Sequence, residues 1–331
     1  MQQLHALYHH EIPSFLQAAA DTPAMQRLKD IGMSCGCQYT AFPLFDPIYA
    51  YSRFDHSLGT ALILWHFTQD EKQALAGLFH DIAAPVFSHT VDFVYGDKDT
   101  QEFTEGRTRQ IIQDSPEIQE ILASLRLTTD DVCDYHIYPL ADNKSPRLSA
   151  DRLEYTFGNL LHYQLSRLGV LKFYYDQINV QMNEKNEPEF VFQSPDYASV
   201  FSHLAIQTSR VYICEECRYT MEFLSRLLKT AIQKQVLTED DLWTTESQVI
   251  GKLKEDPETN LLFTQLCGLS DLTITDKPLN STSIQTSSKR RFIDPLVPGY
   301  GRVSEFDAKY ASQIYELQHI NFDVWMTPNF L

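Results

Sequence analysis

The sequence predicts a mainly α-helical protein with one small β-hairpin and a short C-terminal segment that is β or irregular. Apolar residues recur at helical spacing through most of the 331 residues. The alternation of apolar and polar residues that is typical of strands is clear in one region, residues 176–194. No internal repeat or low-complexity tract is visible, so repeat architectures are set aside.

The N-terminal half of the chain is predicted to form a series of helices. Residues 14–30, SFLQAAADTPAMQRLKD, predict a helix, a break at Asp-Thr-Pro and a second helix that begins at Pro23. Apolar periodicity then predicts further helices over residues 57–69, 71–82, 106–125 and 150–168.

The C-terminal half begins with the hairpin, in which INVQM and FVF flank the polar turn NEKNEP. A long helical stretch is expected over residues 196–236, and another helical region from EDDLW to about residue 268. From residue 271 the chain is rich in Thr and Ser, and SKRRFIDPLVPGYGRVSEF predicts a short strand or two.

Length favours one large domain or two ordinary ones. We expect three parts: a helical core at 1–170, the hairpin with a helical extension packed on that core at 171–270, and a C-terminal segment with short strands at 271–331.

The formal net charge of −17 argues against a nonspecific nucleic-acid binder and against attraction to anionic membranes. A phosphorylated substrate would need local positive charge, from a metal or from placed arginines. Most of the excess carboxylates are interpreted as a solvated surface. No apolar stretch of about 18 residues occurs, and MQQLHALYHHEIPSF lacks the features of a secretory signal. We expect a cytoplasmic protein that does not contact membranes.

Six cysteines could pair or bind zinc. Cys214 and Cys217 have C-x-x-C spacing, but they fall in what is predicted to be one continuous helix with no turn between them. Cys35 and Cys37 are one residue apart, which is short for a second ligand pair. Ordinary reduced cysteines are therefore expected.

Three distant segments place ionisable residues at the ends of predicted helices. FHDIAAPVFSH has His80 and Asp81 at the end of an apolar helix, RFDHSLGT has His56 at the head of a helix, and LSADRLEYTFGN has Asp151 in a first turn. A buried polar group without a partner costs about 2–7 kcal/mol. A His-Asp pair alone is usually a salt-bridged helix end, but two imidazoles and two carboxylates that converge suit Mn, Fe, Co, Ni, Zn or Mg.

Taken together, these motifs resemble those of the HD superfamily of metal-dependent phosphohydrolases. RFDHSLG, the His-Asp pair with a histidine nine residues after His80, and a later Asp-Arg before an aromatic helix carry the resemblance, supported by DTPAMQRL and FPLFDPIYAYSRFDHSLG. The branch that is most similar contains the deoxynucleotide triphosphohydrolases and the sterile-alpha-motif HD proteins. The resemblance runs from about residue 21 to residue 269 and implies a helical HD-domain bundle.

The resemblance also implies roles for individual residues. It implies one divalent metal ion held by His56, His80, Asp81 and Asp151. It further implies phosphate contacts from Arg53 and Arg152, sugar contacts from Tyr155 and Asn159, and catalytic roles for His89 and Asp92.

Each implied role has a structural alternative. Arg53 could pair with Asp55 or another carboxylate. His89 could be a core histidine whose hydrogen bonds are satisfied within the protein, and Tyr155 could contribute to packing alone. His136 is a further candidate, with His89, for a second metal, although a surface or core role is favoured.

The chain also departs from the family pattern. Ala84 stands where a family histidine is expected, and Thr104 occupies the place of another. Met33 and Ser34 lie near the place of a Gln-Leu pair that reads the sugar of deoxynucleotides. Loss of a general acid typically costs about 10²- to 10⁴-fold in rate, so these departures put both activity and deoxynucleotide specificity in question.

The leading hypothesis is a phosphohydrolase that acts on a nucleotide or another phosphorylated small molecule by attack of metal-bound hydroxide on phosphorus. The alternative is a degenerate HD protein that binds a nucleotide or metal as a regulatory module. A third hypothesis, oxygen activation by two irons, needs about six ligands where four are found. A homodimer is expected.

Overall fold

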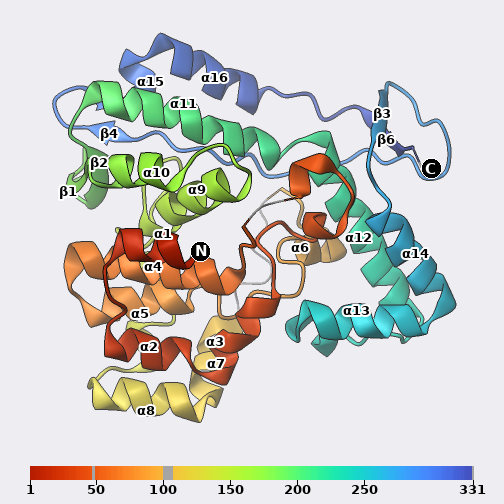
Figure 1. The fold of residues 1–331 in the computed structure, drawn as a ribbon, viewed down its shortest axis with the longest axis horizontal. Coiled ribbons are helices and arrows are strands. Elements are labelled where there is room, and N and C mark those ends of the chain that lie inside the picture. Colours follow the sequence, from red (N-terminus) through yellow and green to blue (C-terminus); the bar gives the residue numbers. More distant parts are fainter. Residues whose placement is uncertain (47–48, 100–106, 330–331) are drawn as a thin grey trace.

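The computed structural model describes residues 1–46, 49–99 and 107–329. Helix α4 (Arg53–Thr68) packs against α1, α5 and α9 in one half of the molecule (Figure 1). The preceding helices are α1 (Gln2–Tyr8), α2 (Ser14–Ala20) and α3 (Pro23–Gln26), and those that follow are α5 (Glu71–Phe79), α6 (Thr90–Tyr95), α7 (Thr108–Asp114), α8 (Pro116–Ser124), α9 (Ala150–His162) and α10 (Leu168–Tyr175).

The start of α4 is fixed by a capping box. The hydroxyl of Ser52 accepts from the backbone N–H of Asp55 (3.2 Å), and the Asp55 carboxylate accepts from the backbone N–H of Ser52 (3.0 Å). These bonds satisfy donors that a helix N-terminus leaves free. The box therefore sets the register that places His56 in the first turn of α4.

The second half of the chain forms α11 (Pro195–Val211), α12 (Glu215–Gln233), α13 (Glu246–Glu255), α14 (Pro257–Cys267), α15 (Val303–Phe306) and α16 (Ala308–Gln318). A four-stranded sheet has the order β1 (Ile178–Met182), β2 (Pro188–Phe192), β4 (Leu296–Val297) and β5 (Gly301–Arg302), and β3 (Leu272–Thr275) pairs with β6 (Trp325–Pro328). In Figure 1, α16 runs alongside α11 on the outside of the molecule.

Buried apolar side chains form two cores. The first lies among α1, α4, α5, α9 and α11 and includes Leu62, Phe157 and Phe201. The second lies around α12, α13 and α14 and includes Leu224 and Leu266. Both cores draw on residues from either side of the expected boundaries at 170 and 270, and those boundaries stay a prediction.

The mainly α-helical class and the hairpin are confirmed, since β1 and β2 pair antiparallel with Ile178 opposite Phe192. The helical stretch expected over 196–236 is present as α11 and α12, but the one continuous helix expected around Cys214 and Cys217 is wrong. The chain breaks between α11 and α12, where Cys214 adopts an extended backbone and its sulfur accepts from the N–H of Cys217 (3.4 Å). The break occurs because α11 buries its apolar face in the first core and α12 in the second.

Two other predicted helices are shorter or interrupted. The helix expected over 106–125 is divided at Ser115, because Pro116 starts a new helix. The helix expected over 150–168 ends at His162. All six cysteines are free thiols, and the sulfurs of Cys37 and Cys217 lie 4.0 Å apart.

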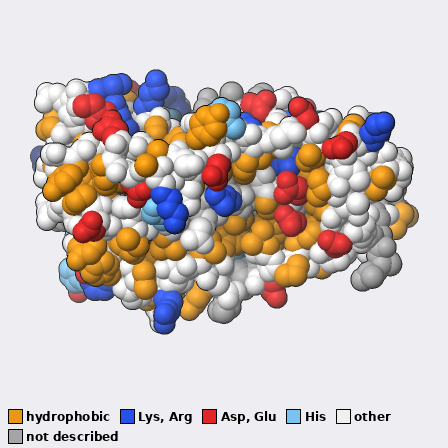
Figure 2. All heavy atoms as spheres, turned by 90° about the horizontal axis from the view of Figure 1, so that it is seen from above, with side chains coloured by type: hydrophobic (Ala, Val, Ile, Leu, Met, Phe, Trp, Pro, Cys, Tyr) orange, Lys and Arg blue, Asp and Glu red, His pale blue; other side chains and the backbone are white. Residues whose placement is uncertain are grey.

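The surface carries charges of both signs. On the face shown in Figure 2, Lys and Arg side chains are spread among Asp, Glu and apolar side chains. Among the helices that the structure describes, none combines the length and the apolar character that crossing a bilayer requires.

Gly59 allows α4 and α9 to approach closely. A Cβ at this position would lie 2.5 Å from Oε1 of the buried Glu154, which is held by several hydrogen bonds. We expect Gly59→Ala to lower the free energy of unfolding by about 1–3 kcal/mol through overpacking, as measured by urea denaturation.

Gly251→Ala is the matched control, because a Cβ there meets nothing within 4 Å on the exposed side of α13. It should stabilise the protein by about 0.5–1 kcal/mol. Equal effects of the two substitutions would contradict the close packing of α4 on α9.

Candidate metal centre and its cavity

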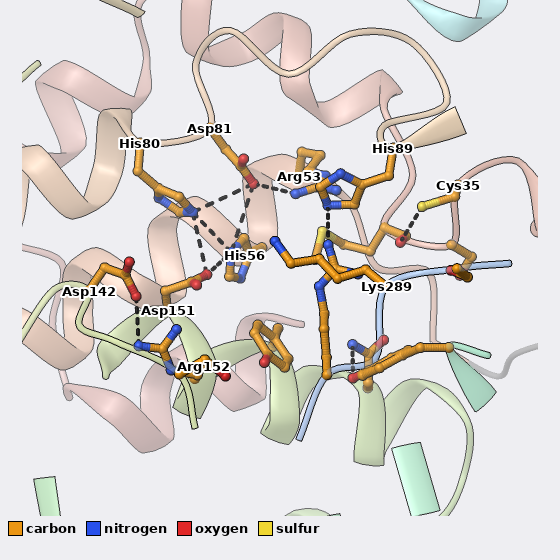
Figure 3. Close-up of a pocket in the computed structure, with 18 of the residues that line it drawn as sticks. Cys35, Arg53, His56, His80, Asp81, His89, Asp142, Asp151, Arg152 and Lys289 are labelled. Atoms are coloured by element: carbon orange, nitrogen blue, oxygen red, sulfur yellow. Dashed lines mark hydrogen bonds and ion pairs between the residues drawn. The ribbon is translucent and has the colours of Figure 1, made fainter. Parts of the chain in front are cut away.

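A cavity of about 590 Å³ opens between α4, α5, α9 and the C-terminal segment (Figure 3). Small-molecule sites typically measure about 300–1,000 Å³. Its wall includes the site residues proposed from the sequence except Asp92, which lies behind His89. The residues in the wall are Arg53, His56, His80, Asp81, His89, Asp151, Arg152, Tyr155 and Asn159. Residues spread over a hundred positions of the chain are thus brought to one cavity.

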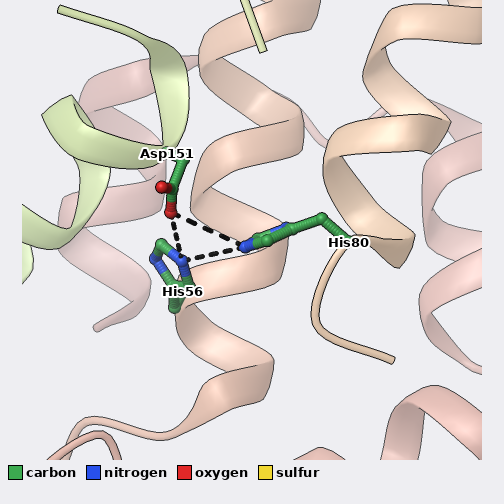
Figure 4. Close-up of side chains that lie close together, drawn as sticks. All are labelled: His56, His80 and Asp151. Atoms are coloured by element: carbon green, nitrogen blue, oxygen red, sulfur yellow. Dashed lines mark hydrogen bonds and ion pairs between the residues drawn. The ribbon is translucent and has the colours of Figure 1, made fainter. Parts of the chain in front are cut away.

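Three of the four predicted metal ligands meet at one end of this cavity (Figure 4). His56 comes from the first turn of α4, His80 from the end of α5 and Asp151 from the first turn of α9. Nε2 of His56 lies 3.1 Å from Nε2 of His80 and 3.0 Å from Oδ1 of Asp151, and Nε2 of His80 lies 3.7 Å from that oxygen.

In both imidazole rings Nδ1, the nitrogen that points away from this group, already has a hydrogen-bond partner. Nδ1 of His56 lies 2.6 Å from a carboxylate oxygen of Glu154, and Nδ1 of His80 lies 2.7 Å from the backbone carbonyl of Gly77. Both partners can only accept, so each ring donates from Nδ1. In the neutral rings the two Nε2 lone pairs therefore face each other and the Asp151 carboxylate.

This donor set fits a divalent cation. Metal–ligand bonds of about 2.0–2.2 Å place neighbouring ligand atoms about 3 Å apart, which matches the separations around His56. Nitrogen and carboxylate donors suit the borderline metals from Mn to Zn. A metal-binding histidine usually donates from its other ring nitrogen to a carboxylate or a carbonyl, as His56 and His80 do.

Asp81, the fourth predicted ligand, lies beside this group. Its Oδ2 is 3.8 Å from Nε2 of His56 and 3.6 Å from Nε2 of His80, and it accepts a 2.7 Å hydrogen bond from Nη1 of Arg53. Arg53 also donates from Nε to Ser88 (2.9 Å). The ion pair keeps one Asp81 oxygen turned toward the arginine, and ligation by Asp81 stays a prediction.

The ion pairs at this end shift the pKa values of its members. Burial opposes the charged form of His56, but hydrogen bonds to Asp151 and Glu154 raise its pKa to about 10. Burial likewise opposes ionisation of Asp151, and its hydrogen bond with His56 lowers the pKa to about 2. Without a cation, His56 is therefore protonated at neutral pH, and its proton occupies the space between His56, His80 and Asp151.

His89 and Asp92 lie next to each other on the other side of the cavity. Nδ1 of His89 is 2.9 Å from the carboxylate of the fully buried Asp92, so Nδ1 donates and Nε2 is left to accept. Burial, with the cations Arg291 and Arg53, holds the pKa of His89 well below its ordinary value. The ring is therefore neutral, with its Nε2 toward Arg291 (3.4 Å).

The three remaining predicted substrate residues line the cavity but also have partners in the protein. Arg152 donates to the carbonyls of Arg147 (2.6 Å) and Asn143, and lies 2.8 Å from Asp142. Tyr155 is 6.2 Å from Tyr212, ring centroid to centroid.

Asn159 donates to the hydroxyl of Tyr212 (2.9 Å). The phosphate and sugar contacts expected of Arg152, Tyr155 and Asn159 stay predictions.

Of the four positions at which the sequence departs from the family pattern, the structure describes Met33, Ser34 and Ala84. Ala84 is buried, and its carbonyl accepts from Arg27 (2.8 Å). Thr104 lies outside the described residues. Met33 and Ser34 do line the cavity. His136 is at its acidic rim, 3.0 Å from Asp134, and its role in a second metal site stays a prediction.

Two parts of the site were not predicted. Glu154 follows Asp151 by three residues, so both lie on one face of α9, and that spacing is a signal that could have been used. The basic run from Lys289 to Arg291 also lines the cavity. Its position carries no periodic signal, because residues 285–295 form no helix or strand.

Comparison with known proteins gives distant similarity. The chain is 27% identical over 254 residues to the uncharacterized protein YdhJ of Bacillus subtilis, which covers 76% of this chain and 75% of that protein. It is 23% identical over 139 residues to the metal-dependent phosphohydrolase cns2 of Cordyceps militaris, which covers 42% of this chain and only 38% of that protein. No protein-family model matches the chain.

Glu154 orients His56, so its charge should affect metal binding. We expect Glu154→Gln to weaken Mn²⁺ binding about 10- to 100-fold, the usual effect of removing such a partner, as measured by isothermal titration calorimetry. Glu117→Gln, on the exposed side of α8, is the control and should bind like wild type. An unchanged affinity in a folded Glu154→Gln protein would contradict this role.

The raised pKa of His56 predicts how stability depends on pH without metal. The folded protein holds a proton that the unfolded chain releases above about pH 6.5, so this contribution is complete below that value. It should be lost as pH rises toward about 10. Urea unfolding of chelator-treated protein across this range should show the decline, and His56→Gln should flatten it. An equal decline in the variant would contradict the assignment.

Proposed function

We propose that the protein is an HD-type, metal-dependent phosphohydrolase that acts on a nucleotide or another phosphorylated small molecule. The observation that carries the proposal is the convergence of His56, His80 and Asp151, whose lone pairs leave space for a cation at one end of a cavity. The distant similarity to a metal-dependent phosphohydrolase supports the same reaction class.

His56, His80 and Asp151 would hold the cation, with Asp81 beside them. A bound divalent cation would polarise a phosphoryl oxygen and lower the pKa of a water molecule from 15.7 to about 7. Asp151 remains ionised at neutral pH, because its pKa lies near 2. It can therefore accept a hydrogen bond from an attacking water.

Arg53 would bind the phosphoryl oxygens. Its guanidinium is almost fully buried at the cavity wall and is held in place by Asp81 (2.7 Å) and Ser88 (2.9 Å). A guanidinium positioned in this way stabilises negative charge that develops as the phosphoester bond breaks.

His89 is positioned to take part in proton transfer. Asp92 fixes its tautomer, so Nε2 can accept a proton and, once protonated, can donate it to the leaving oxygen. An anionic substrate at this point would raise the low pKa of His89. This arrangement supports a catalytic role for His89, with Asp92 positioning it.

A nucleotide is supported by the composition of the cavity wall. Tyr155, Tyr163 and Tyr212 line it together with Met33 and Met221. These side chains offer apolar and aromatic surface on which a base or sugar can pack. The phosphate-binding groups lie at the polar ends of the same cavity.

Activity tests the proposal. Purified protein with Mn²⁺, Mg²⁺, Co²⁺, Ni²⁺, Fe²⁺ or Zn²⁺ should release product from a nucleotide or a generic phosphomonoester. His80→Ala should lower turnover more than about a hundredfold, since even partners of metal ligands contribute about 10- to 100-fold. His10→Ala, an exposed histidine, is the control.

The alternative, a binding module, predicts a different result. Because Ala84 replaces a family histidine, a nucleotide could bind without being hydrolysed. If a nucleotide raises the melting temperature of the protein but no product forms with any of these metals, the binding module is favoured and the enzymatic proposal is contradicted.

A further inference from the structure

Three sulfur atoms lie close together in the second core, where that core borders the cavity. Sγ of Cys37 is 4.0 Å from Sγ of Cys217, and Sγ of Cys217 is 3.8 Å from Sδ of Met221. All three side chains are buried and belong to the second core. The proposed function assigns no role to their sulfur atoms.

The fold brings these residues together from two distant segments. Cys217 and Met221 are four residues apart on α12, and residues at this spacing share one face of a helix. Cys37 begins a short 3₁₀ helix 180 residues earlier in the chain. The preceding Gly36 has a left-handed backbone (φ +86°), and a Cβ at this position would collide with Leu224 of α12. The close approach of two main-chain segments therefore sets the position of the sulfurs.

The distances between the sulfurs fit a metal ion with three ligands. With metal–sulfur bonds of about 2.3 Å, three sulfurs in one plane around an ion lie about 4.0 Å apart. The distances from Sγ of Cys217 to the other two sulfurs, 4.0 and 3.8 Å, agree with this value. Two edges of such a triangle are thus already present.

The chemistry of the donors decides which cation fits. Thiolate and thioether sulfurs together select Cu⁺, whereas Zn²⁺ in proteins takes cysteine, histidine or carboxylate ligands. In the part of the chain that the structure describes, no three cysteine sulfurs lie within 4.8 Å of one another. The third sulfur beside Cys37 and Cys217 is the thioether of Met221. This donor set therefore favours Cu⁺ over Zn²⁺.

An ion can reach these sulfurs, and the surroundings favour thiolates. Cys217 and Met221 both line the cavity, so an ion can enter from it. Cys217 lies in the first turn of α12, where the helix dipole stabilises negative charge. The next residue, Arg218, contributes a fully buried guanidinium. Both features stabilise the thiolate form that binds a metal.

We propose that Cys37, Cys217 and Met221 form a binding site for Cu⁺, separate from the divalent-cation site at the other end of the cavity. Binding breaks the two S–H bonds, forms two Cu–thiolate bonds and one Cu–thioether bond, and releases two protons to solvent. No atom changes its oxidation state. The inference does not depend on the proposed function, because none of the three residues is a predicted ligand of the divalent cation.

Titration of the reduced, full-length chain with Cu⁺ tests the proposal. Under anaerobic conditions, with a chromophoric chelator competing for Cu⁺, the protein should bind one equivalent and show the ultraviolet absorption of Cu⁺–thiolate bonds. Cys217→Ser should weaken binding more than about a hundredfold, because even the partners of metal ligands contribute about 10- to 100-fold. Met221→Leu removes the sulfur at similar volume and should weaken binding about 10- to 100-fold.

Two controls complete the design. Cys133→Ser removes a thiol that lies outside the sulfur cluster and should bind Cu⁺ like the wild type. Excess Mn²⁺ should leave Cu⁺ binding unchanged, because the two sites share no ligand. The conservative Met221→Leu variant keeps the test valid if Cys217→Ser does not fold.

Wild-type affinity for Cu⁺ in a folded Cys217→Ser or Met221→Leu protein would overturn the proposal. An equal loss in Cys133→Ser would do the same, since it would show binding by thiols in general. Displacement of Cu⁺ by Mn²⁺ would place the copper at the histidine site and would also overturn it. None of these results depends on whether the protein hydrolyses a phosphoester.

Discussion

The site depends on one electrostatic constraint: two imidazole nitrogens and a carboxylate oxygen meet within 3.0–3.7 Å, and each imidazole has its other nitrogen engaged. Only a positive charge between them makes that arrangement favourable. Without a metal the charge is a proton on His56, and a divalent cation would replace it. Because Glu154 is fully buried and sterically fitted against Gly59, the orientation of His56 is determined by the packing of α4 on α9.

The rest of the fold holds this group of side chains in position. Three helices of the first core place His56, His80 and Asp151 at their ends, where backbone groups and side chains remain available for polar contacts. The second core, around α12, supports the opposite side of the cavity and anchors the C-terminal segment through Arg218. The cavity thus lies between two packed cores. His56, His80 and Asp151 are on the side of the first core, and the segment Ser288–Arg291 is anchored to the second.

Much of this could be predicted from the sequence because it follows from local patterns. The hairpin, the start of α3 at Pro23, and the positions of His56, His80 and Asp151 at helix ends all have short-range signals. The break after Val211 has none, since no glycine or proline marks it and the competition between two cores decides it. The position of Arg291 in the cavity wall has no short-range signal either, because contacts with distant residues hold its irregular segment in place.

The most direct test of the account is the metal content of the protein. Elemental analysis after equilibration with a divalent cation and removal of the excess should find one cation per chain in the wild type. A folded double variant, His56→Ala with Asp151→Ala, should hold none. Absence of a stoichiometric cation from the wild-type protein with every metal tried, or equal content in the folded variant, would contradict the account.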